Sequence, residues 1–189
     1  PAAGPLPKKY HLRWDFSDGT SLSFVLQMWG FVRLLERPDF DQRPHKEVGI
    51  PPLSPELTFE RFDQLLEEYP DKTKKGVKGF LVTSQHVNGI GNSYCQDILF
   101  RARLHPAHKI PVINPDERHQ LYTAIQETMQ KAIAQGGRED ERDLFDHPGG
   151  YLRLMGSQTV GTPCPECGTT IQKIAYLGGA CYLCPHCQV

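Results

Sequence analysis

The sequence lacks any long apolar run and any excess of charge of one sign. None of its apolar segments approaches the roughly 18 residues that a membrane span requires, so we expect no membrane contact. Lysine and arginine number 21 against 22 aspartate and glutamate residues, which leaves a formal net charge of -1. Nucleic-acid-binding proteins usually carry a basic excess, so composition alone does not indicate that function. Any such role requires local placement of positive side chains.

No signal peptide precedes the first strand-like segment, and the chain lacks an initiator methionine. We interpret the start at Pro1 as that of a processed product or a fragment. The 189 residues, 39% of them hydrophobic, suffice for one ordinary domain or two small ones. The absence of a signal peptide favours a cytoplasmic location.

The cysteines are unevenly distributed along the chain. Cys95 stands alone, whereas the other five lie between Cys164 and Cys187. A secreted disulfide scaffold would spread its cysteines along the sequence, so the clustering favours a reducing compartment and a metal site.

Two CxxC pairs form the strongest motif. Cys164-Pro-Glu-Cys167 is followed, after sixteen residues, by Cys184-Pro-His-Cys187. Four thiolates at this spacing suit the tetrahedral geometry of a closed structural Zn²⁺ site, with no open position for catalysis. Disulfides or an iron–sulfur cluster are the alternatives. The intervening residues predict a β-hairpin with its turn at Gly178-Gly179, which makes the module a zinc ribbon with one ion. Cys181 is expected to pack inside and His186 to face solvent.

Strand patterns precede helical ones. Residues 10–17 and 21–27 flank Asp18-Gly19, a dipeptide typical of hairpin turns, and a third strand is expected at 31–35. Apolar residues at three- and four-residue steps predict a helix from Thr58. Further helices are expected at 74–83, 93–103 and 115–134, the last one capped by Asn114.

Gly89-Ile90-Gly91-Asn92 precedes one of these helices. Glycines let backbone N–H groups approach an anion, and a helix N-terminus adds a favourable partial charge, so a phosphate is the natural ligand. A plain corner between two helices explains the tetrapeptide equally well. Four lysines just upstream are either a solvated face or a source of local positive charge: Lys72, Lys74, Lys75 and Lys78.

Residues 87–106, VNGIGNSYCQDILFRARLHP, resemble the helix–two-turn–helix segment of the formamidopyrimidine-DNA glycosylase / endonuclease VIII family. The terminal CPECG and CPHCQ are similar to the zinc finger of that family, and the resemblance covers residues 8–188. In that family both motifs grip a DNA duplex while a damaged base is flipped into a pocket.

The resemblance implies roles for individual residues. Asn92, with Gly89 and Gly91 before it, matches a phosphate-contacting asparagine, and Lys78 matches a lysine ahead of that turn. Asp97 stands where relatives usually have glutamate. Met28 lies in the strand region that supplies wedge residues in the family, although a methionine in an apolar strand is more often core.

A polar loop follows the last predicted helix. Residues 139–141 are a charge run, which is usually solvated, but the matching family segment lies near the flipped base. Four residues flank the run and are candidates for DNA contact: Arg138, Arg142, Tyr151 and Arg153. Three histidines without ligand-spaced partners are interpreted as surface residues: His105, His108 and His119.

The sequence also departs from the family pattern. Residues 27–31, QMWGF, replace the usual Arg-Arg-Phe-Gly, and Gly178-Gly179-Ala180 stands where a finger arginine normally meets DNA. Thr83-Ser84 replaces the usual Asp-Gln. Family members use an N-terminal proline amine as nucleophile, followed by glutamate, but Ala2-Ala3 follow Pro1 here. We therefore assign no catalytic residue to this chain.

The combined prediction is an α+β chain in three parts. Residues 1–50 are assigned to the last strands of a β-sandwich, 51–156 to a helix–two-turn–helix domain, and 157–189 to the zinc ribbon. The expected function is that of the DNA-binding part of a bifunctional glycosylase and abasic-site lyase in base-excision repair. Its expected partner is double-stranded DNA with damaged bases or abasic sites. The protein is expected to be a monomer in the bacterial cytoplasm, near the nucleoid. The alternative is a non-catalytic nucleic-acid-binding zinc-ribbon protein.

Overall fold

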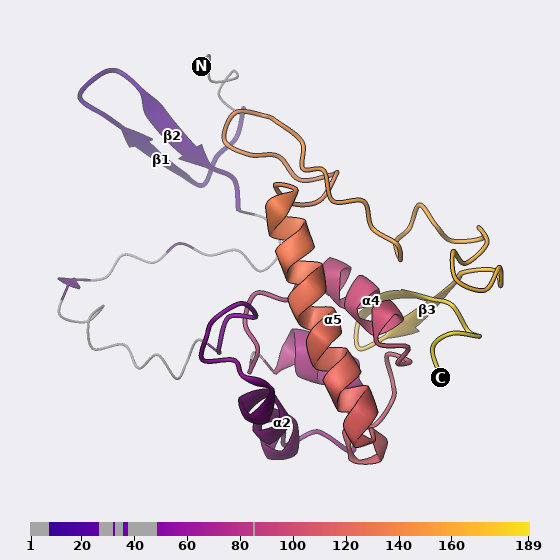
Figure 1. Ribbon diagram of the computed structural model, residues 1–189. Helices are drawn as coiled ribbons and strands as arrows, with labels where there is room; N and C mark the ends of the chain where they lie inside the picture. Colours follow the sequence, from indigo (N-terminus) through magenta and orange to yellow (C-terminus); the bar gives the residue numbers. More distant parts are fainter. Residues whose placement is uncertain (1–7, 27–31, 33–35, 38–48, 85) are drawn as a thin grey trace.

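The computed structural model describes residues 8–26, 32, 36–37, 49–84 and 86–189 (Figure 1). The strand expected at 31–35 and the wedge candidate Met28 therefore lie outside the described residues, apart from the single position Val32. Among the residues described, no helix is both long enough and apolar enough to cross a bilayer.

The first element is an antiparallel hairpin, as predicted. Strands β1 (Leu12–Asp15) and β2 (Ser21–Phe24) pair with Leu12 opposite Phe24. Gly19 adopts a φ of 81° in the turn, a conformation that glycine reaches without strain. Asp18 Oδ1 accepts hydrogen bonds from the amide and the hydroxyl of Thr20, at 2.9 and 2.6 Å. In Figure 1 this hairpin lies at one end of the molecule, apart from the helices.

Helices make up the middle of the chain. In order they are α2 (Phe59–Glu68), the short α3 (Gly76–Lys78), the π-helical turn η2 (Gly79–Thr83), α4 (Asn92–Arg101), the 3₁₀ turn η3 (Ile110–Val112) and α5 (Pro115–Ala134). The helix predicted at 74–83 is thus a short α-helical turn that widens into a π-helix, and the helix predicted at 93–103 begins and ends earlier.

Helix α5 has the bounds that the sequence predicted because both of its ends carry strong local determinants. Asn114 Oδ1 accepts from the Glu117 amide at 3.0 Å, and Glu117 Oε2 accepts from the Asn114 amide at 2.8 Å, which completes a capping box. After Ala134 the chain turns through Gly136 and Gly137, with φ values of 72° and 95°. An L-amino acid with a side chain would be strained in either conformation.

The main core lies where α2, η2, α4 and α5 meet. Its buried side chains include Phe62, Leu66, Phe80, Ile98, Leu99, Leu121 and Ile125. At its edge the Arg118 guanidinium of α5 pairs with two carboxylates of α2, Asp63 at 2.6 Å and Glu67 at 2.7 Å. This fork holds the first turns of α5 against α2.

The ribbon forms a second, smaller unit. Strands β3 (Gln172–Tyr176) and β4 (Gly179–Leu183) pair antiparallel with Tyr176 opposite Gly179. The turn therefore consists of Leu177 and Gly178, with φ values of 51° and 72°, and not of Gly178-Gly179 as predicted. Two positive φ values are what a two-residue turn between twisted strands requires. Gly179 is consequently the first residue of β4.

A second cluster of buried residues joins the ribbon to the end of α4. Phe100 from α4 packs in it with Met155, Ile171 and three of the clustered cysteines. The described part of the chain is α+β, as expected. The three domain boundaries stay a prediction.

Candidate metal centre and nucleic-acid interface

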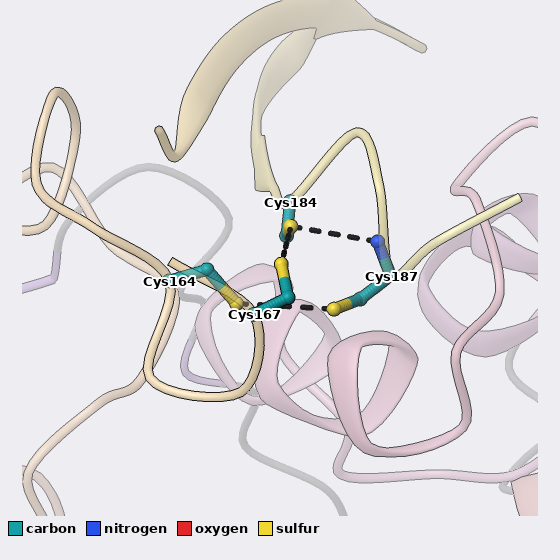
Figure 2. Close-up of side chains that lie close together, drawn as sticks. All are labelled: Cys164, Cys167, Cys184 and Cys187. Carbon is teal, nitrogen blue, oxygen red and sulfur yellow. Dashed lines mark hydrogen bonds between the residues drawn. The ribbon is translucent and has the colours of Figure 1, made fainter. Parts of the chain in front are cut away.

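The four predicted cysteines converge on one point. All four Sγ atoms lie within 4.8 Å of one another (Figure 2). The Sγ atoms of Cys167 and Cys184 are 3.4 Å apart, and those of Cys164 and Cys187 are 3.9 Å apart. Tetrahedral coordination with Zn–S bonds of about 2.3 Å sets sulfur atoms about 3.8 Å apart, so this donor set fits such an ion. All six cysteines are unpaired in the structure, and both of these Sγ separations exceed the roughly 2.05 Å of a disulfide bond.

Cys167 differs from the other cluster members in its exposure. Its neighbours are buried, whereas Cys167 is exposed, and hydrogen bonds from Thr169 lower the pKa of its thiol to about 6. A lowered pKa favours the thiolate, the form that binds a metal. Cys95 and Cys181 lie outside the cluster and are fully buried, and burial raises the pKa of Cys95. Within the described ranges, no histidine belongs to a group that could hold an ion.

The N-terminus of α4 is open to an outside acceptor. Its N-cap is Gly91, which has no side chain to bond the amides of the first turn. The other long helices, α2 and α5, are capped by Thr58 and Asn114. Gly89 adopts a φ of 88°, and Asn92 is exposed at the first position of the helix. Uncapped amides and the helix dipole together favour an anion at this end.

Lys78 lies beside this helix terminus. Its side chain is only 2% exposed, and its ammonium donates a 2.8 Å hydrogen bond to the carbonyl of Tyr176 in β3. No carboxylate within the described part of the chain forms an ion pair with it. A Cβ placed on Gly179 would lie 3.5 Å from Lys78 Nζ and 3.9 Å from Asn92 Oδ1. Lys78, Asn92 and the first residue of β4 therefore meet at one place.

The other lysines of the upstream run are arranged differently. Lys72 pairs with Glu67 at 2.9 Å, and Lys75 pairs with Asp71 at 2.6 Å. Lys74 is exposed. Of the four lysines, Lys78 is the one that the fold brings to the N-terminus of α4.

Arg153 is held by acidic residues of the loop after α5. Its guanidinium bonds Glu139 at 2.7 Å and Asp140 at 2.9 Å, and its side chain is 15% exposed. Arg138 pairs in the same way with Asp140 and Glu141. Contact of Arg153 with DNA stays a prediction, and it requires these ion pairs to rearrange.

Two buried polar residues of α4 hold other segments in place: the sequence interpretation noted Asp97 without a contact for it, and it missed Gln96. Gln96 bridges the helix to β4, and Asp97 accepts hydrogen bonds from segment 151–155. Burial raises the pKa of the Asp97 carboxyl, although backbone N–H groups and the Tyr151 hydroxyl act in the opposite direction. Tyr151, a candidate for DNA contact, is 1% exposed and packs against Tyr94 with ring centroids 5.8 Å apart. The available signal was the position of these two polar residues between the apolar residues Cys95 and Ile98 of the predicted helix.

A family model, the formamidopyrimidine-DNA glycosylase H2TH domain, matches residues 49–142. The chain is 30% identical to formamidopyrimidine-DNA glycosylase of Lactobacillus delbrueckii, over 97% of this chain and 68% of that protein. The chain belongs to the formamidopyrimidine-DNA glycosylase family. The same enzyme of Bacillus cereus is also 30% identical, over 97% of this chain and 67% of the relative.

Solved structures of the formamidopyrimidine-DNA glycosylase family have the same fold. The MutM (Fpg) protein of Thermus thermophilus superposes with a TM-score of 0.82 at 27% identity, over 98% of this chain and 70% of that one. Fpg of Lactococcus lactis in complex with abasic-site DNA superposes with a TM-score of 0.80 at 28% identity, over 98% and 68% of the two chains. The predicted membership of this family is confirmed.

Proposed function

We propose that this chain binds and positions duplex DNA for a bifunctional DNA glycosylase and abasic-site lyase, which removes oxidised bases in base-excision repair. The observation that carries the proposal is the convergence of Lys78, Asn92 and the open N-terminus of α4 beneath the ribbon. Binding and positioning are the roles assigned to the described residues, with no catalytic step among them.

A DNA phosphate is the anion that best suits this place. The Lys78 ammonium lies beside the first turn of α4 with a carbonyl as its hydrogen-bond partner, and no carboxylate of the described residues pairs with it. Burying an ammonium without a counter-charge is costly, and a phosphate supplies that charge. The amides of Asn92 and Ser93, at the first two helical positions, have no intrahelical acceptor and are suited to bonding phosphate oxygens.

The relatives support a DNA duplex as the source of that phosphate. The Lactococcus lactis structure contains abasic-site DNA, and a further MutM structure with a TM-score of 0.80 contains carbocyclic 8-oxo-G DNA. A binding surface made of a few local positive groups also explains how a chain with a net charge of -1 binds a polyanion.

We infer that the cysteine cluster holds one Zn²⁺ in a structural role. Cys164, Cys167, Cys184 and Cys187 supply four sulfur donors, so a bound ion has no open position for a substrate. When bound, the ion cross-links the two knuckles of the ribbon. The ribbon in turn holds the Tyr176 carbonyl against Lys78. A monomer in the bacterial cytoplasm, associated with the nucleoid, is the state in which we expect the protein to work.

The test is fluorescence anisotropy of a labelled DNA duplex that carries an abasic-site analogue, titrated with the full chain at several salt concentrations. Affinity should fall steeply with salt because phosphate contacts release counterions. Lys78→Gln should reduce the slope of log affinity against log salt by about one. Lys74→Gln, at an exposed position, is the control that removes the same charge. Affinity independent of salt, or equal effects of the two substitutions, would contradict the proposal.

A further inference from the structure

Gln96 is buried between the proposed phosphate site and the ribbon. It lies one turn after Asn92 on α4, and it is 2% exposed. Its Nε2 donates to Ala180 O at 3.2 Å, and its Oε1 accepts from the Tyr182 amide at 3.2 Å. The side-chain amide thus bonds the backbone of β4 on both sides of Cys181, much as a neighbouring strand would.

The same side chain also contacts Asn92. Gln96 Nε2 lies 3.0 Å from the carbonyl oxygen of Asn92 and 3.2 Å from its Oδ1. Gln96 Nε2 has two N–H groups for these two oxygens and Ala180 O, so one N–H is shared between two acceptors. With Oδ1 on the Gln96 side, the Asn92 amide turns its Nδ2 to Ala180 O in β4, to which it donates at 3.3 Å. An amide nitrogen carries two N–H groups, so the second one remains for an acceptor outside the chain.

We propose that Gln96 is a positioning residue, which orients the Asn92 amide for a DNA phosphate and ties that orientation to the docked ribbon. The inference rests on the proposed function, since it concerns the same phosphate. Through this link the ribbon contributes to phosphate binding indirectly, because its Ala180 carbonyl anchors the amides of Asn92 and Gln96. The turn of the ribbon consists of Leu177 and Gly178 and presents no cation.

A second glutamine provides a matched control. Gln188 is also 2% exposed, and it also joins the ribbon to the helical part of the chain. Its Oε1 accepts from the Cys184 amide at 3.0 Å, and its Nε2 donates to Leu104 O at 3.0 Å. No hydrogen bond joins it to Asn92. Loosening of the ribbon in general should therefore affect both glutamine variants, whereas loss of positioning should affect Gln96 alone.

The experiment compares Gln96→Met and Gln188→Met, because methionine keeps approximately the volume of glutamine and removes the amide. Affinity for the abasic-site duplex should fall about fivefold in Gln96→Met, the equivalent of one ordinary hydrogen bond, and remain unchanged in Gln188→Met. In an Asn92→Ala background, Gln96→Met should cause no further loss. Equal losses in both glutamine variants, or a full additional loss in the Asn92→Ala background, would overturn the inference.

A measurement without DNA separates this inference from the proposed function. In NMR spectra of the free chain, Gln96→Met should shift the side-chain amide resonances of Asn92 and speed their hydrogen exchange, whereas Gln188→Met should leave them unchanged. Those changes in a chain that fails to bind DNA would remove the proposed function and leave the orienting role of Gln96. Unchanged Asn92 resonances in Gln96→Met would remove the inference alone. Should Gln96→Met fail to fold, Gln96→Glu keeps the acceptor for the Tyr182 amide and serves for the same comparison.

Discussion

The Tyr151 hydroxyl donates a 2.7 Å hydrogen bond to Asp97 Oδ2 across 54 residues of sequence. The same carboxylate accepts from the backbone amides of Leu154, at 3.1 Å, and Met155, at 2.8 Å. Asp97 belongs to α4, and Tyr151 ends the loop that follows α5. One buried carboxylate therefore attaches the segment leading into the ribbon to the helix whose N-terminus forms the proposed phosphate site.

Removal of the Asp97 carboxylate should destabilise the fold more than removal of the Tyr151 hydroxyl. Asp97→Ala leaves two buried donors and one part-buried donor without an acceptor, and it should lower the free energy of unfolding by about 3 kcal/mol, against about 1 kcal/mol for Tyr151→Phe. Urea denaturation measures both values. In the Asp97→Ala background, Tyr151→Phe should have little further effect. Tyr122→Phe is the control, because its hydroxyl bonds Leu57 O at 2.7 Å and should contribute equally in both backgrounds. Full additivity of the Asp97 and Tyr151 changes would show that the two groups act independently.

Titration of Asp97 should make the free energy of unfolding depend on pH. Burial raises the pKa of this carboxyl in the folded chain above its ordinary value of 3.8. As pH rises past 3.8 the unfolded chain loses the proton first, so the folded state binds more protons and its stability falls. The free energy of unfolding of the unaltered chain, relative to Asp97→Asn, should therefore decrease with pH until the folded carboxyl has titrated. An increase over the same range would mean that the three donors outweigh burial.

The cysteine cluster should hold one zinc ion, which native mass spectrometry of the chain would detect. Cys184→Ala should abolish binding, because a closed structural site depends on all four thiolates. The ribbon should then become sensitive to protease, since zinc binding and folding are coupled in such modules. Cys181→Ala is the matched control, because Cys181 is equally buried in β4, the strand that directly precedes Cys184, and lies outside the cluster. Retention of the ion by Cys184→Ala, or an iron–sulfur absorption band, would contradict a zinc site.

Local sequence determined the features that depend on neighbouring residues. Asn114, Pro115 and Glu117 set the start of α5 because capping requires contacts only within the first turn. The Asp18-Gly19 turn and the two CxxC pairs are local in the same sense, and both were predicted correctly. The resemblance to the family predicted that Lys78 and Asn92 belong to the same DNA-binding site.

Tertiary structure decided which of these groups meet and which are neutralised. Four lysines precede the Gly-rich turn, but only packing shows that Lys72 and Lys75 pair with acids while Lys78 lies under the ribbon. Spacing along a chain cannot predict this outcome, because the partner of Lys78 is 98 residues away. The turn between β3 and β4 likewise lies one residue earlier than composition suggested, since the strand register places Gly179 opposite Tyr176.

The sequence by itself thus determined the family, the α+β class, the caps of α5 and the four sulfur donors, because each depends on residue type and short-range spacing. The tertiary structure alone decided the burial of Gln96 and Asp97 and the ion pairs that hold Arg153. Those contacts join segments that are distant in sequence, and their geometry follows from how the ribbon and the loop after α5 pack on one helix.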